Sequence, residues 1–194
     1  GGVAKGAISI SFVLGVVVSL IAILLAAPIV NVFGASGEVF DQAVAYLQVR
    51  FLALPALLVA MVGHGIYRGH QDTRTPLYVA LGVNVVNLLL DPVLIFGFSL
   101  GVVGAAWATV VAQGIGAGVF LALMFGRDRE RLGLRGPSEG MGSRDVGRIL
   151  GAGWPMMLRS TALLFAITAT TVAATRIGAQ QVAAHQIALQ VWIF

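Results

Sequence analysis

The chain has no cysteine and few charged residues. Without cysteine there can be no disulfide, no thiolate metal site and no cysteine nucleophile. Only 10% of the 194 residues are charged, whereas soluble globular domains carry about 25%. The usual enzyme signatures are also missing, because the sequence has no phosphate-binding loop, no HExxH and no GxSxG. We therefore expect neither a soluble protein nor an enzyme.

Long apolar runs take up most of the chain, which is 58% hydrophobic and has a mean hydropathy of +0.94. Each complete run has about the 20 residues that cross a hydrocarbon core roughly 30 Å thick. The first run is too long for the apolar part of a signal peptide. The sequence predicts an all-α, polytopic helical membrane protein, cut from a longer transporter-sized protein. The runs are at Ile8–Phe33, Ala43–Tyr67, Leu77–Phe98, Val102–Phe125 and Ile149–Thr175, with a truncated one from Gln180.

Basic residues gather in alternate connections between these runs. Lys5 precedes the first run, Arg68 and Arg74 follow the second, and an arginine-rich segment, 126–148, follows the fourth. The intervening connections are poor in basic residues. By the positive-inside rule the start of the chain, 68–75 and 126–148 are cytoplasmic, in a multi-pass protein of the inner (plasma) membrane. We thus attribute the net charge of +4 to topology and expect no nucleic-acid partner.

The polar segment with Pro137 predicts a boundary between two groups of helices. We expect helices of one group over 1–126, a cytoplasmic linker over 127–148, and the start of a second group over 149–194. Acids of the linker such as Asp128 we expect to be solvated. Small residues recur at four-residue spacing, which predicts close helix packing; the pairs are Gly65 and Gly69, Gly97 and Gly101, and Gly114 and Gly118.

Asp91 is the only acidic residue deep inside an apolar run. A carboxylate at membrane depth costs about 2.5–3.5 kcal/mol by insertion scales, so it indicates a functional site. Asn84, Asn87 and Asp91 are spaced i, i+3, i+7 and share one helical face. An apolar environment favours the protonated acid, and a neighbouring amide can hydrogen-bond to either form. The pattern predicts a proton-coupling site; the alternative is a carboxyl that only joins helices.

Other polar residues lie in the same or neighbouring runs. Thr109, in the next run, can add a hydroxyl to this cavity. Arg159 lies about ten residues into the fifth run, where it either lines a central cavity or plays a structural part. His64 and His70 we expect at the interface with water.

Several motifs resemble those of one transporter family. Arg68-Gly-His-Gln-Asp-Thr-Arg-Thr-Pro-Leu-Tyr78 is similar to the cytoplasmic loop and fifth-helix entry of MATE (multidrug and toxic compound extrusion) transporters. Asn84-x-x-Asn87-Leu-Leu-Leu-Asp91-Pro-Val-Leu-Ile-Phe96 resembles their fifth helix. Gly101-Val-Val-Gly-Ala-Ala-Trp-Ala-Thr109 resembles the start of the sixth, and Ala183-Ala-His-Gln-Ile187 the eighth-helix motif. The DinF-like subgroup is the most similar.

The resemblance implies most of the amino-terminal lobe and the start of the carboxy-terminal lobe, helices three to eight of twelve. It also implies monomeric efflux of amphipathic, often cationic small molecules by alternating access, without a cofactor. The coupling ion would be H⁺ or Na⁺, with Asp91 and Asn87 as ligands for Na⁺. Asp91, Asn87 and Thr109 match the family's cation site, whose other aspartate belongs to a helix outside this chain. Two alternatives are a flippase of lipid-linked saccharides from the same superfamily and a non-functional membrane fragment.

Overall fold

The computed structural model describes residues 2–32, 36–134, 143–177 and 187–188. Within these residues the chain forms helices, turns and bends, and no strand. It divides into two compact units, Gly1–Met141 and Gly142–Phe194, which are taken in turn below. The predicted all-α membrane fold is confirmed.

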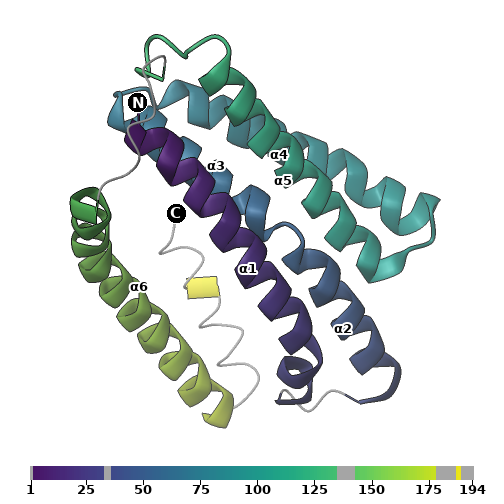
Figure 1. Cartoon of the computed structure of the whole chain (residues 1–194). Coiled ribbons are helices and arrows are strands. Elements are labelled where there is room, and N and C mark those ends of the chain that lie inside the picture. The colour runs from purple at the N-terminus through teal and green to yellow at the C-terminus, as the bar shows by residue number, and fades with distance from the viewer. Residues whose placement is uncertain (1, 33–35, 135–142, 178–186, 189–194) are drawn as a thin grey trace. The chain divides into compact units, whose positions relative to one another are not determined.

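The first unit is a bundle of antiparallel helices (Figure 1). α5 packs against α2, α3 and α4, while α1 packs against α2 and α3. Among the described residues, three helical stretches are long and apolar enough to span a membrane, and a bent pair of helices forms a fourth. These agree with the first four predicted runs. The elements are α1 (Gly2–Val32), α2 (Gly37–Phe51), α3 (Leu54–Gly69), α4 (Arg74–Pro92), the π-helix η1 (Val93–Gly97) and α5 (Gly101–Phe125).

The second predicted run is a broken helix and not a continuous one. α2 and α3 meet at an angle of 43°, next to Pro55, which has no N–H to continue the helical hydrogen bonds. At the break the hydroxyl of Ser19 on α1 donates to the carbonyl of Phe51 at 2.8 Å, which satisfies a backbone acceptor inside the membrane. Gly15 makes this approach possible, because a Cβ there would lie 2.6 Å from the Cα of Pro55.

The glycines that bring helices together are not the predicted ones. Among the described residues, a Cβ at Gly65, Gly69, Gly101, Gly114 or Gly118 would meet nothing within 4 Å, and one at Gly97 would only reach Val93 at 3.9 Å. The prediction that these pairs pack helices closely is therefore wrong for this unit. Close contacts are instead made at other positions of the bundle; these are Gly15, Gly63, Gly104 and Gly116.

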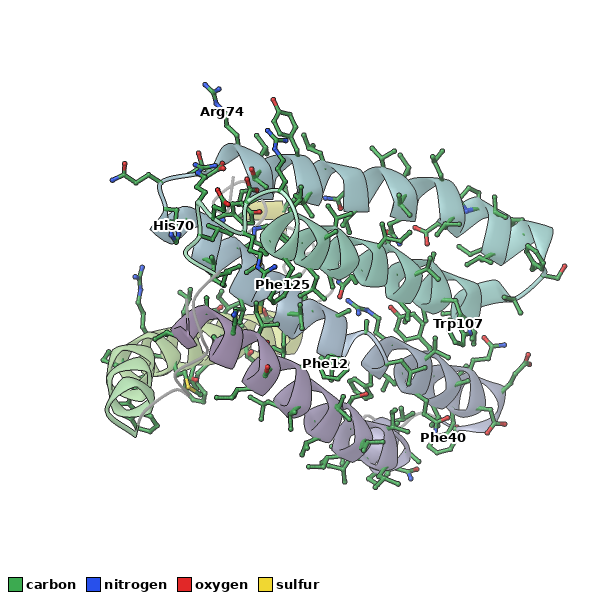
Figure 2. All side chains as sticks on the ribbon, turned by 45° about the horizontal axis from the view of Figure 1, so that its top comes forward. Phe12, Phe40, His70, Arg74, Trp107 and Phe125 are labelled. Carbon is green, nitrogen blue, oxygen red and sulfur yellow. The ribbon has the colours of Figure 1, made fainter. Side chains whose placement is uncertain are left out.

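Basic residues mark one end of the first unit, where α3 passes into α4 and α5 ends; we call it the basic end. Figure 2 shows His70 and Arg74 there. The segment after α5 folds back on this end: the hydroxyl of Tyr67 donates to the carboxylate of Asp128 at 2.8 Å, and Leu132 and Leu134 are buried in the core. The prediction that Asp128 is simply solvated is therefore wrong.

The second unit contains α6 (Ser143–Ile177). This helix begins inside the predicted linker, so polar residues before Ile149 form its first turns. Pro155 lies within it, and the side chain of Arg159 is exposed. The truncated run from Gln180 and most of the motif at 183–187 lie outside the described residues. The assignment of 1–126, 127–148 and 149–194 to two lobes and a linker stays a prediction.

Candidate functional site

The site is built where α4 and α5 run antiparallel. The side-chain amide of Asn87 on α4 donates to the hydroxyl of Thr109 on α5 at 3.5 Å, and that hydroxyl donates to the carbonyl of Ala105 at 3.0 Å. Both side chains are partly buried. Thr109 is thus fixed by its own helix, and it orients the Asn87 amide. Because the NH₂ group is engaged, the amide oxygen is left as an acceptor.

Asp91 lies one helical turn beyond Asn87, at the point where α4 changes into a π-helix. Pro92 ends the regular hydrogen bonding because it has no N–H, and η1 follows with the N–H of Phe98 donating to the carbonyl of Val93 at 3.0 Å. π-helical turns of this kind are frequent at functional sites. Asp91 is half-buried, and within the described part of the chain its carboxyl has no hydrogen-bond or ion-pair partner.

The opposite helix is shaped to receive this widened turn. A Cβ at Gly104 of α5 would lie 2.7 Å from the carbonyl oxygen of Leu94, so glycine lets α5 contact the backbone of η1 directly. This contact places the α5 backbone close to the turn that follows Asp91. The Asn87 amide and the Thr109 hydroxyl therefore meet between α4 and α5, with Asp91 one turn further along α4. Oxygen groups of these kinds can hold a proton or coordinate a small hard cation.

One predicted site residue of the first unit, Asn84, does not join the Asn87–Thr109 pair. The amide of Asn84 is exposed and donates to the carbonyl of Ala80 on its own helix at 2.9 Å. Asn84 lines a separate cavity with His64 and Gln113, two residues that we did not predict for the site. Gln113 carried a signal, since it is an amide in the middle of an apolar run. Arg159 is on α6 in the second unit, and its place in the site stays a prediction.

Asp72 organises the basic end of the bundle. Its carboxylate accepts hydrogen bonds from the backbone N–H groups of Arg74 and Thr75 at 3.1 and 3.0 Å. It also forms an ion pair with Arg131 at 3.0 Å. The backbone N–H of Thr75 holds the pKa of the Asp72 carboxyl below its usual range, helped by the Thr75 hydroxyl and Arg131 against partial desolvation. The carboxylate caps α4 where the helix dipole is positive.

The comparison with known families decides what kind of chain carries this site. The MatE family model matches residues 2–93, which include Asn87 and Asp91. Protein DETOXIFICATION 43 of Arabidopsis thaliana is 34% identical over 190 residues, 96% of this chain and 35% of that protein. DNA damage-inducible protein F of Escherichia coli (strain K12) is 34% identical over 159 residues, 77% of this chain and 33% of that protein. The chain belongs to the MATE family.

Solved MATE structures have the same fold. A MATE structure in the bent conformation superposes with a TM-score of 0.85 at 26% identity, covering 98% of this chain and 43% of that one. An outward-facing multidrug resistance MATE transporter of the MOP superfamily gives 0.81 at 26% identity, covering 98% and 42%. This MATE chain spans about a third of the length of the curated relatives above and about two fifths of these structures.

Proposed function

We propose that this chain forms part of a secondary active antiporter that exports amphipathic, often cationic compounds in exchange for H⁺ or Na⁺ by alternating access. Multidrug efflux is supported at the level of the family, since relatives include a multidrug export protein of Staphylococcus haemolyticus, 34% identical over 122 residues, 63% of this chain and 27% of that protein. We propose Asp91 as the coupling carboxylate, and Asn87 and Thr109 as the groups that orient its ion.

The single observation that carries the proposal is the hydrogen bond between Asn87 and Thr109, one turn from an intramembrane acid that has no partner among the described residues. A carboxyl that only joined helices would have a partner on a neighbouring helix, because an unpaired buried charge is costly. Within the described residues Asp91 has none. Loading an ion there removes one negative charge from the α4–α5 seam, which changes the packing that these helices prefer.

The sidedness follows from the charge of the connections. We propose that the basic end, with Arg68, Arg74 and Arg127, faces the cytoplasm of a cell whose inner membrane holds the protein. α4 then runs outward from Arg74, so Asp91 lies in the outer half of the bilayer. An ion entering from outside reaches Asp91 before it reaches Asn87.

The alternative of a lipid-linked saccharide flippase has less support. Such transporters are expected to line their cavity with several basic residues, which pair with phosphate. Within the described spanning helices of the first unit, Arg50, in the last turn of α2, is the one arginine away from the basic end. We therefore do not favour an anionic lipid substrate.

The proposal is tested by Asp91→Asn in the transporter that carries this chain. Asparagine keeps the size of the side chain but cannot bind and release a proton. We expect efflux of an amphipathic cation such as ethidium from whole cells to fall to the level of cells without the transporter, while the protein accumulates in the membrane as before.

The matched control is Asp41→Asn, the same substitution at an exposed acid near the start of α2. It should leave efflux unchanged. Efflux by the Asp91→Asn variant at the rate of the unmodified protein would overturn the proposed role. Loss of the variant from the membrane would point to the helix-joining alternative, and Asp91→Glu, which keeps the titratable group, would then be expected to restore both accumulation and transport.

A further inference from the structure

A cavity with three polar lining residues lies between α3, α4 and α5, on the basic-end side of the Asn87–Thr109 pair. It has a volume of about 160 Å³ and is lined by polar and apolar side chains. Three of its polar lining residues come from three different helices: His64 from α3, Asn84 from α4 and Gln113 from α5. Gln113 lies in the middle of α5, at the depth where a polar group is most costly.

Two polar atoms of this cavity are left without a protein partner. Among the described residues, Nδ1 of His64 and Oε1 of Gln113 are buried and accept or donate no hydrogen bond. Buried polar atoms are nearly always paired, with protein or with ordered water. The His64 ring is held in place by an edge-to-face contact with Phe120 at 4.9 Å between centroids, so it cannot readily turn away to find another partner.

The cavity meets the physical conditions for water. A water molecule needs about 10–15 Å³ of accessible volume and two to four polar partners, and apolar cavities stay dry whereas polar ones fill. A volume of about 160 Å³ holds several water molecules. The amide oxygen of Asn84 supplies a further acceptor, because its NH₂ group already donates to Ala80.

The cavity is also adjacent to the candidate site along both α4 and α5. Asn84 precedes Asn87 by three residues on α4, and Gln113 follows Thr109 by four on α5, so each is one turn away, about 5.4 Å, toward the basic end. On α3, Arg68 lies one turn beyond His64 in the same direction. Polar groups thus follow one another from His64 to Asp91, while the buried core residues Tyr67 and Phe120 lie on the basic-end side of the cavity.

We propose that this cavity is the water-filled inner part of an inlet from the basic end to the Asn87–Thr109 pair, closed in this structure by the buried side chains of Tyr67 and Phe120. The role of the cavity in ion release rests on the proposed function, whereas the presence of water in the cavity does not depend on it. Ions taken up at Asp91 from one side of the membrane would leave through this cavity to the other side. His64 and Gln113 are the groups that hydrogen-bond its water.

The test uses single cysteines in the transporter that carries this chain, with any cysteines outside the chain replaced, because the chain itself has none. The probe is 2-aminoethyl methanethiosulfonate, which reacts with the thiolate, a form that requires water. We expect Gln113→Cys to react at least tenfold faster than Val111→Cys, which lies two residues away at nearly the same depth on the opposite, exposed face of α5. Mass spectrometry of the modified protein measures both rates.

A second pair of variants keeps the test decisive if Gln113→Cys fails to accumulate. Asn84→Cys should react at least tenfold faster than its neighbour Val85→Cys, which is 53% exposed. Ala60→Leu, which fills the cavity from α3, should slow the labelling of Gln113→Cys toward the rate of Val111→Cys. Equal rates within either pair, or no effect of Ala60→Leu, would overturn the inlet.

The same labelling separates the inlet from the proposed function. In an Asp91→Asn background we expect transport to be lost while Gln113→Cys labelling is unchanged. If labelling is slow but Asp91→Asn still abolishes transport, the inlet is wrong and the coupling proposal stands. If labelling is fast but Asp91→Asn transports normally, the cavity is hydrated and the coupling proposal is wrong.

Discussion

The side-chain amide of Asn87 donates to the hydroxyl of Thr109 across the α4–α5 interface, one turn from Asp91. The two residues lie on different helices, so this hydrogen bond links α4 to α5 close to Asp91. We propose that a change in the charge of Asp91 alters it. The following predictions test this relationship and the contacts that support it.

Removing the hydroxyl of Thr109 should weaken transport more than it weakens the fold. Thr109→Val keeps the shape of the side chain but leaves the Asn87 amide without its acceptor. We expect a several-fold lower initial rate of efflux, with the free energy of unfolding lowered by no more than about 1.5 kcal/mol. Thr109→Ser, which keeps the hydroxyl, is the control and should transport normally. Equal activity of the valine and serine variants would show that the hydrogen bond plays no part.

Tyr67 should contribute to stability through its bond to Asp128. Tyr67 is fully buried and its hydroxyl lies 2.8 Å from that carboxylate. Tyr67→Phe leaves the carboxylate without this donor, and we expect a loss of about 1–3 kcal/mol in the free energy of unfolding. Tyr78→Phe is the matched control, since Tyr78 is 69% exposed. Thermal unfolding in detergent compares the two; a Tyr67→Phe variant as stable as Tyr78→Phe would contradict the prediction.

Asp72 should make stability depend on pH in the acid range. Its pKa is lower in the folded protein than its ordinary value of about 3.9, chiefly because of the Thr75 backbone N–H. A lowered pKa stabilises the fold above the unfolded-state value, and this stabilisation is lost as the pH falls through the folded-state value. We therefore expect Asp72→Asn to be less stable than the unmodified protein at pH 7, and the difference to shrink below about pH 4.

The control for this pH dependence is Asp41→Asn, at an exposed acid away from the basic end. Its difference from the unmodified protein should stay the same from pH 7 to pH 3. Thermal midpoints measured across that range give both curves. A constant difference for Asp72→Asn as well would show that its carboxylate does not act through its charge.

Two glycines of α5 should respond differently to alanine. A Cβ at Gly104 would lie 2.7 Å from the backbone oxygen of Leu94, whereas one at Gly114 meets nothing within 4 Å among the described residues. We expect Gly104→Ala to lose about 1–3 kcal/mol by overpacking and to reduce transport, because α5 is pushed from η1. Gly114→Ala should be neutral or slightly stabilising. Equal stability of the two variants would mean that the α5–η1 contact is not close.

These glycines show what the sequence could and could not predict. Hydropathy located the first four spans, because lipid requires long apolar helices. Four-residue spacing selected Gly114 and Gly118, yet Gly104 and Gly116 make the close contacts. Four-residue spacing shows only that small residues share one face of a helix. The packing of the whole bundle determines which face contacts a neighbouring helix. For the same reason the close approach of α1 to Pro55 at the break of the second span could not be predicted, because it needs Gly15 of another helix.

In the candidate site, too, some features could be predicted from the sequence and others could not. Asn84, Asn87 and Asp91 do lie on one stripe of α4, as their spacing predicts. Asn87 meets Thr109, as predicted, but Asn84 bonds to its own backbone and lines a cavity with His64 of α3. The sequence of one helix does not determine which neighbouring helix each of its polar residues will contact. Asp128 was missed as a contact because its partner Tyr67 lies far away in the sequence.

The most direct test of the central claim measures proton release by the transporter in proteoliposomes loaded with a pH-sensitive dye. Adding an amphipathic cation to the unmodified protein, after proton loading in acid, should release protons from Asp91. We predict that Asp91→Asn abolishes this substrate-induced release while Asp41→Asn retains it in full. Proton release by Asp91→Asn equal to that of Asp41→Asn would contradict the account.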